Sequence, residues 1–283
     1  MKLWDIIETK KGVILDIEGV LVSNLETGEI FGESLKFMKK LGKENKKFVL
    51  LTNLARISSI RVAEILKDLE FNMVTEERII NPTKAAIGQI LEKKFDKPIR
   101  VFLISEGGHI ENLALYPWIK LARSPPIDAI LLGASRNLTY NELNFAFRLF
   151  KEGVPLIVLG GDLTSEGKFL DDEGEYLMEG AFAKVLEIAT GKDAKYVGKP
   201  CKEMFYEALD KLQLDIKDVV MIGDSFNTDV IGASRLGIDT VWVIREQIDI
   251  RRYYEKLEEN VKPNTKVYVT TSLDVSADIK QVF

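Results

Sequence analysis

The sequence is poor in the residues that build covalent cross-links and transition-metal sites. Its 283 residues include one cysteine, Cys201, and one histidine, His109. A disulfide framework needs pairs of cysteines, and a zinc cluster needs several cysteine or histidine ligands, so these counts exclude both classes. We expect His109 to be a surface or capping residue, and Cys201 to be a small packing residue.

Long apolar runs and blocks of like charge are also missing. No stretch reaches the length of a membrane span, and the N-terminus lacks the apolar run of a signal peptide. The formal net charge is −5, with acids and bases interspersed. Nucleic-acid binding needs a concentrated basic surface, so we expect neither a nucleic-acid nor a membrane partner, and we expect a cytoplasmic location.

Strand and helix patterns alternate along the whole chain. Short apolar runs predict strands at 12–15, 48–51, 100–104, 128–132, 154–159, 195–197, 219–222, 240–244 and 266–269. Amphipathic spacing predicts helices between them, and Thr139 with Glu142 forms a capping box at the start of one helix. This alternation is typical of α/β proteins, so we expect a doubly wound parallel sheet with right-handed crossovers.

The character of the sequence changes near Pro82 and again near Gly180. The segment 160–180 is rich in Gly, Asp and Glu with little apolar periodicity, and we expect it to be a long surface loop or ribbon. A smaller α/β domain inserted into a split outer domain explains both changes. We therefore assign residues 1–81 and 180–283 to the core and residues 82–179 to the inserted domain.

Four polar clusters follow predicted strands: Asp16 with Glu18, Thr52 with Asn53, Gly198-Lys199-Pro200, and Gly223 to Asp229. If the outer domain holds one parallel sheet, these clusters meet at its carboxyl edge, where open α/β sheets bind ligands. Acids there suit a hard cation, while a hydroxyl, backbone amides and a lysine suit a phosphate. Each cluster alone is also found in ordinary turns, helix caps or loops, and the specificity lies in their conjunction.

With these clusters in this order, the chain resembles the haloacid dehalogenase superfamily of aspartyl-phosphate-forming phosphatases. The first motif of that family, Asp-x-Asp-Gly-Val/Thr, reads Asp16-Ile17-Glu18-Gly19-Val20 here, and the later motifs correspond to Thr52, Lys199 and Gly223-Asp224 to Asp229. The resemblance is to the nitrophenylphosphatase and phosphoglycolate-phosphatase branch. It implies a Rossmann-like core and a large α/β cap between the second and third motifs.

The resemblance also implies residue roles. It makes Asp16 the nucleophile and Glu18 the acid–base residue, and it places Mg²⁺ on Asp16, the backbone carbonyl of Glu18 and Asp224. The phosphoryl group would bind Thr52, the amide of Asn53 and Lys199, with Asp229 orienting Lys199 or a metal-bound water. The implied ligand is a small phosphorylated metabolite facing Gly160, Gly161 and Asp162 of the cap, and a homodimer through the cap is left open.

Glu18 departs from the motif of active members, which carry aspartate. Its carboxyl is displaced by about 1 Å, and a misplacement of that size can cost roughly 10²-fold in rate. General acid–base help is worth about 10² to 10⁴ in total. Three hypotheses follow: a Mg²⁺-dependent phosphatase with an aspartyl-phosphate intermediate, a phosphate- and metal-binding regulatory protein with weak or no turnover, and a phosphotransferase that uses another acceptor.

Overall fold

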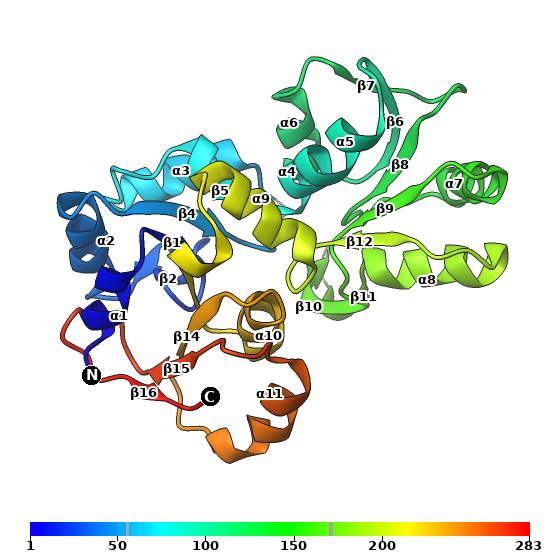
Figure 1. Ribbon diagram of the computed structural model, residues 1–283. Coiled ribbons are helices and arrows are strands. Elements are labelled where there is room, and N and C mark those ends of the chain that lie inside the picture. The colour runs from blue at the N-terminus through cyan, green and yellow to red at the C-terminus, as the bar shows by residue number, and fades with distance from the viewer. Residues whose placement is uncertain (55–56, 170–171) are drawn as a thin grey trace. The chain divides into compact units, whose positions relative to one another are not determined.

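The computed structural model describes residues 1–54, 57–169 and 172–283, and the chain divides into two compact units (Figure 1). The core unit comprises Met1–Thr52, Ser59–Ile80 and Lys199–Phe283, and the cap unit comprises Asn53–Ser58 and Asn81–Gly198. The chain leaves the core unit and returns to it, which agrees with the predicted insertion of one domain into another.

The core unit contains a seven-stranded sheet with the strand order β16-β15-β14-β13-β1-β4-β5. Neighbouring strands pair in parallel except for β16, which is antiparallel to β15. Its strands are β1 (Gly12–Leu15), β4 (Lys47–Leu51), β5 (Ile79–Ile80), β13 (Val219–Gly223), β14 (Asp239–Val243), β15 (Val267–Thr270) and β16 (Lys280–Gln281). Every residue of β1 and β13 is buried, as expected for strands covered by helices on both faces.

Helices and a small hairpin complete the core unit. The helical elements are α1 (Leu3–Thr9), α2 (Ser34–Lys43), α3 (Ser59–Asp68), η1 (Glu76–Arg78), α9 (Lys202–Leu212), η3 (Ile216–Asp218), η4 (Phe226–Val230), α10 (Ile231–Ser234), η5 (Ile250–Tyr253) and α11 (Tyr254–Asn260). The hairpin consists of β2 (Val22–Asn24) and β3 (Glu29–Ile30), and it directly follows the first polar cluster.

The cap unit has a five-stranded parallel sheet of its own, with the order β12-β9-β8-β6-β7. Its strands are β6 (Ile99–Ile104), β7 (Ile119–Leu121), β8 (Ala129–Leu132), β9 (Leu156–Leu159) and β12 (Lys195–Val197). Its helical elements are α4 (Pro82–Ala86), η2 (Ile87–Leu91), α5 (Glu92–Lys94), α6 (Gly108–Ala114), α7 (Tyr140–Glu152) and α8 (Glu179–Thr190). The predicted capping box is confirmed, because the Glu142 N–H donates to Thr139 Oγ1 while the Thr139 N–H donates to Glu142 Oε2.

The second domain boundary differs from the sequence assignment. The predicted strand 195–197 exists, but it pairs with β9 of the cap sheet, with Tyr196 opposite Val158. Helix α8 also packs on the cap sheet, through Ala183 and Leu186. Residues 180–198 therefore belong to the cap unit rather than the core, because their hydrogen bonds and apolar contacts are made there.

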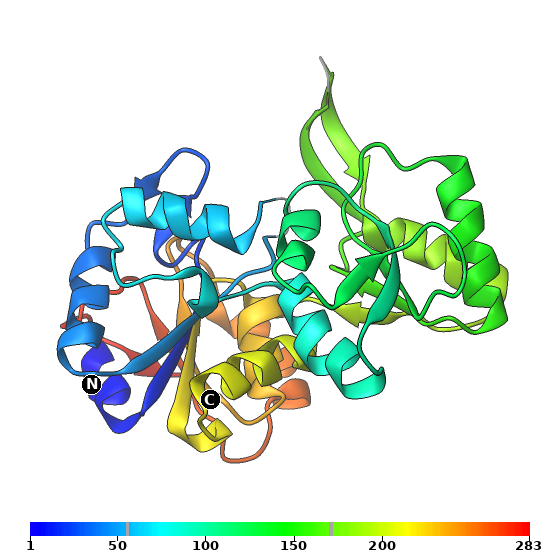
Figure 2. The same cartoon turned by 90° about the horizontal axis from the view of Figure 1, so that it is seen from above.

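The segment predicted as a loop or ribbon contains an antiparallel hairpin of β10 (Thr164–Phe169) and β11 (Asp172–Leu177). Leu170 and Asp171, which also fall in that segment, lie outside the described residues. Figure 2 shows the hairpin projecting from the rest of the cap unit. Across the described ranges, none of the helices has the length and apolar character that crossing a membrane requires.

Candidate active site

Asp16 lies one residue beyond β1, at the carboxyl end of the central strand pair. Its backbone N–H donates to the carbonyl of Ile222 at 2.9 Å, so the pairing of β1 with β13 extends to this residue. Its Oδ1 accepts a hydrogen bond from the Ile17 N–H at 2.8 Å. The Asp16 carboxylate is therefore buried and held in place at the edge of the sheet.

Glu18 has different surroundings from Asp16. Strand β1 ends at Leu15, so the extended backbone that would place both side chains on one face does not form. Glu18 instead points to the hairpin, where its Oε1 accepts a hydrogen bond from the Leu25 N–H at 3.0 Å. The acid–base role of Glu18 stays a prediction.

Asp224 follows β13, the strand that neighbours β1. Its backbone carbonyl accepts a hydrogen bond from Trp242 Nε1 at 2.8 Å. Gly19 makes room for its side chain, since a Cβ at position 19 would lie 2.0 Å from Asp224 Oδ2. Gly19 also has a φ of +76°, a left-handed conformation that favours glycine. The glycine of the first motif is thus required by both backbone conformation and space.

Asp229 lies in the helical turn η4 and is fully buried. Its Oδ2 accepts a hydrogen bond from the Ser225 N–H at 3.1 Å. A Cβ at position 223 would come within 2.3 Å of the Asp229 Cβ. Gly223 is therefore the residue that lets this turn fold back over the end of β13.

Lys199 joins two of these acids. Its Nζ lies 2.8 Å from Asp16 Oδ1 and 2.8 Å from Asp229 Oδ1, and its side chain is almost completely buried. The sequence predicted Lys199 at the end of a core strand, whereas β12 before it belongs to the cap sheet. Lys199 still reaches the acids, because it is the first residue of the segment that returns to the core unit.

The charges at this centre do not balance. Burial disfavours the ammonium group, but the carboxylates of Asp16 and Asp229 outweigh it and raise the pKa of Lys199. Burial raises the pKa of Asp224 to about 6, and the charge of Asp16 adds to this effect. Burial and the charge of Asp16 likewise raise the pKa of Asp229. Three carboxylates here face one ammonium group, an arrangement that favours binding a further cation.

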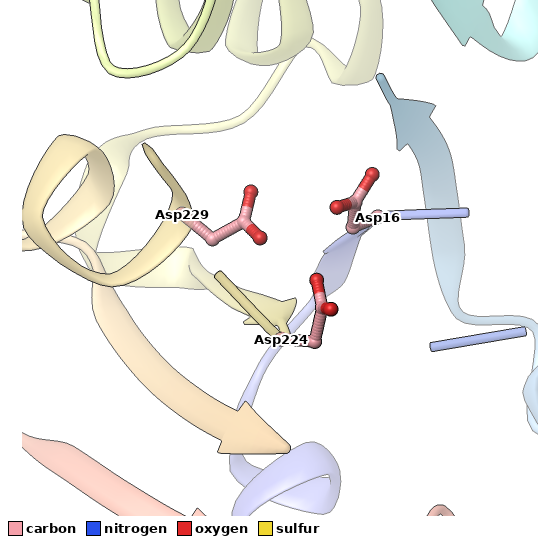
Figure 3. A group of neighbouring side chains, drawn as sticks. All are labelled: Asp16, Asp224 and Asp229. Carbon is pink, nitrogen blue, oxygen red and sulfur yellow. The ribbon is translucent and has the colours of Figure 1, made fainter. Parts of the chain in front are cut away.

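The three aspartates could hold a metal ion. One carboxylate oxygen from each of Asp16, Asp224 and Asp229 lies within 4.8 Å of the others. Figure 3 shows the three side chains turned toward one another from the ends of β1 and β13 and from η4. Carboxylate oxygens suit Mg²⁺, and a bound cation would lower the raised pKa values of Asp224 and Asp229. The residues present therefore fit a divalent cation.

Thr52 follows β4, the strand that pairs with β1 on its other side. It is buried, and its backbone N–H donates to the carbonyl of Ile80 at 3.0 Å. Asn53, the next residue, belongs to the cap unit and is exposed. The proposed contacts of Thr52 and Asn53 with a phosphoryl group stay predictions.

The predicted substrate-facing residues of the cap unit lie beside an acid that the sequence did not indicate. Gly160 has a φ of +151°, and a Cβ there would lie 1.8 Å from Glu179 Oε1. Glu179 is 4% exposed, and its Oε2 has no hydrogen-bond partner among the described residues. Burial raises its pKa to about 7, and the charge of Asp162 adds to this rise. No periodicity or motif marks Glu179, so sequence reasoning missed it.

His109 contradicts its expectation as a surface or capping residue. It is fully buried in the cap unit, with Nδ1 2.7 Å from Thr83 Oγ1. Burial lowers its pKa to about 4, so the ring is neutral near pH 7. Cys201 forms no disulfide, is partly buried and precedes helix α9.

Arg245 is a second residue that sequence reasoning missed. Its Nε and Nη2 donate to the carbonyls of Gly19 and Val20 at 3.2 and 3.0 Å. Its Nη1 donates to Glu33 Oε1 at 2.6 Å. Arg245 thus fixes the turn that follows Asp16, from more than 200 residues away along the chain. No motif connects it to that turn.

Known proteins match this chain over most of its length. The family model for haloacid dehalogenase-like hydrolases matches residues 13–116, and a HAD-hydrolase-like model matches residues 196–273. The haloacid dehalogenase-like hydrolase domain-containing protein 2 of Bos taurus is 31% identical over 234 residues, covering 82% of this chain and 83% of that protein. The acid sugar phosphatase of Staphylococcus haemolyticus is 26% identical, covering 89% of this chain and 91% of the relative.

A solved structure shows the same fold. The p-nitrophenyl phosphatase from Archaeoglobus fulgidus superposes with a TM-score of 0.77 at 28% identity, covering 94% of this chain and 97% of that chain. The two family models match residues in the first and last segments of the core unit, and the Bos taurus relative matches 82% of the chain. Together with the acids at the carboxyl ends of β1 and β13, these matches show that the chain belongs to the haloacid dehalogenase-like hydrolases.

Proposed function

We propose that this hydrolase is a Mg²⁺-dependent phosphatase that cleaves a small phosphomonoester through an aspartyl-phosphate at Asp16. The observation that carries the proposal is the arrangement of Asp16, Asp224 and Asp229 around the buried ammonium of Lys199. The acid sugar phosphatase and p-nitrophenyl phosphatase that the chain resembles act, by their names, on phosphate esters.

In the proposed first step, the Asp16 carboxylate attacks phosphorus. An oxygen–phosphorus bond forms at Asp16 while the bond to the leaving oxygen breaks, and the leaving group departs with the electron pair. The hydrogen bond from the Ile17 N–H fixes the direction of the Asp16 carboxylate. Water then attacks the phosphorus of the acyl phosphate, which releases phosphate and restores Asp16.

Phosphoryl transfer depends mainly on positioning and charge neutralisation. Lys199 supplies one positive charge next to Asp16, and Asp229 holds that ammonium in place from its other side. Thr52 would add its hydroxyl and Asn53 its amide as donors to the phosphoryl oxygens. Mg²⁺, when bound to Asp16, Asp224 and the backbone carbonyl of Glu18, supplies the remaining positive charge.

Substrate selection is proposed to belong to the cap unit. Gly160, Gly161 and Asp162 are our candidates for contacts with the part of a small phosphorylated metabolite that carries no phosphate. The neighbouring acids Asp162 and Glu179 would suit hydroxyl or amino groups on it.

The proposal is tested by phosphate release from 4-nitrophenyl phosphate with and without Mg²⁺. We expect Mg²⁺-dependent turnover that Asp16→Asn lowers by at least about 10³-fold, since removing a catalytic nucleophile removes the covalent route. Asp68→Asn is the matched control, because Asp68 is an exposed aspartate of the core unit. Full activity of Asp16→Asn would contradict the proposal.

A second candidate function, a phosphate- and metal-binding protein with little turnover, is supported by the hydrogen bond that engages Glu18 with Leu25. It predicts that Mg²⁺ and inorganic phosphate bind with measurable heat, while no phosphate ester in a metabolite panel is cleaved. Calorimetry and the panel together distinguish the two functions.

A further inference from the structure

The Glu18 carboxylate is built into the hairpin that follows the first motif. Its Oε1 accepts a hydrogen bond from the Leu25 N–H at 3.0 Å, and the Leu25 side chain is 1% exposed. The ladder of this hairpin pairs Val22 with Ile30 and Asn24 with Glu29. Leu25 lies beyond these pairs, so the hairpin ladder supplies no acceptor for its N–H. The Glu18 carboxylate accepts that hydrogen bond instead.

The rest of the hairpin is closed by hydrogen bonds of its own. Asn24 Oδ1 accepts from the N–H groups of Glu26 and Thr27 at 2.8 and 3.0 Å. At its base, the Gly19 N–H donates to the carbonyl of Val22 at 2.8 Å. Glu18 therefore connects the turn after Asp16 to the far end of β2, which fixes the hairpin at two points.

The glutamate side chain at position 18 is long enough to reach the Leu25 amide. An aspartate at position 18 would be shorter by about 1 Å, which is enough to break a well-aligned hydrogen bond to Leu25. The acids that gather at the catalytic centre of the described chain are Asp16, Asp224 and Asp229, and Glu18 is not among them. The Glu18 oxygen that bonds Leu25 is engaged with the hairpin backbone.

We propose that Glu18 is a positioning residue for the hairpin and does not protonate the leaving group. This phosphatase therefore takes substrates whose leaving group departs as a stable anion, such as phenolic, enolic or carboxylic phosphates. This inference rests on the proposed function. The Asp16 oxygen bonds to phosphorus, the phosphorus–oxygen bond breaks, and the leaving oxygen keeps the electron pair and later takes a proton from water. Phosphates of simple alcohols, which need a proton from an acid as they leave, are poor substrates.

The test is a leaving-group series measured as kcat/KM. Substituted phenyl phosphates cover leaving groups more acidic than phenol itself, whose pKa is about 10, and an alkyl phosphate provides the basic extreme. A positioned general acid is worth about 10² to 10⁴, so we expect the alkyl phosphate to react at least about 10²-fold more slowly than 4-nitrophenyl phosphate. The value of kcat/KM should fall steeply as the leaving group becomes more basic.

Two variants separate positioning from proton transfer. Glu18→Gln keeps a carbonyl oxygen that accepts from Leu25 but cannot donate a carboxylic proton, whereas Glu18→Ala loses both. We expect Glu18→Gln to change kcat/KM by the same factor for every substrate, so the dependence on the leaving group keeps its slope. Hydrogen exchange at the Leu25 amide should be slow in wild type and Glu18→Gln and fast in Glu18→Ala.

A shallow dependence in wild type that becomes steep in Glu18→Gln would overturn the inference, because it would show that Glu18 protonates the leaving group. Unchanged exchange at Leu25 in Glu18→Ala would overturn the positioning role. If no phosphate ester of the series is cleaved by any form, the proposed function and the substrate class both fail. The exchange measurement would then still decide what Glu18 does to the hairpin.

Discussion

Glu179→Gln should stabilise the protein in a pH-dependent way. Burial raises the pKa of Glu179 from 4.5 to about 7 in the folded chain. At 1.36 kcal/mol for each pH unit, ionising this carboxyl costs the fold about 3 kcal/mol. In the unfolded chain the group ionises near 4.5, so the folded state holds a proton that the unfolded state has lost. The free energy of unfolding therefore falls as pH rises from 4.5 to 7 and is level above 7.

The amide of glutamine stays neutral and avoids this cost. Between pH 5.5 and pH 8.5, the advantage of Glu179→Gln over wild type should grow by about 2 kcal/mol, as measured by denaturant unfolding at both pH values. Glu152→Gln is the control, because Glu152 is an exposed glutamate of the same unit, and its difference from wild type should not change with pH. An advantage that is equal at both pH values would refute the buried, protonated state of Glu179.

Three further substitutions test the geometry of the centre. Gly19→Ala should abolish activity and destabilise the fold by several kcal/mol, seen in the thermal midpoint, because its Cβ would collide with Asp224 at a positive φ; a wild-type midpoint and rate would contradict this. Lys199→Met should leave buried carboxylates without their counter-charge and cost about 3 to 5 kcal/mol in denaturant unfolding, and a loss below about 1 kcal/mol would show that the ion pairs matter little. Arg245→Gln should lower kcat/KM by at least about tenfold, because the turn after Asp16 loses the hydrogen bonds that Arg245 donates to the carbonyls of Gly19 and Val20. Unchanged kinetics would show that these hydrogen bonds do not support catalysis.

The strands and the acidic residues that follow them could be predicted because they depend on local patterns. Apolar runs such as 12–15 and 219–222 favour buried strands, and the structure confirms both. Once those strands are neighbours, Asp16 and Asp224 must lie at one edge. The order of the motifs therefore predicted the cluster without any knowledge of distances.

Contacts between distant segments could not be predicted in the same way. Residues 195–197 read as a strand, but nothing in three residues says that the partner is β9 of the cap sheet. The Glu18 side chain could equally face the catalytic centre or the hairpin, and only the position of the Leu25 amide decides between them. His109 follows two glycines and was expected at the surface or at a helix cap, yet the cap unit encloses it completely.

Asp16 must become phosphorylated during turnover if it is the nucleophile. Rapid mixing with 4-nitrophenyl phosphate and Mg²⁺, acid quenching and peptide mass mapping would measure this directly. We expect one phosphoryl group on the peptide that contains Asp16, formed as fast as nitrophenolate is released and absent from Asp16→Asn. Turnover with a phosphoryl group on another residue, or single turnovers fast enough to measure with none on Asp16, would contradict it.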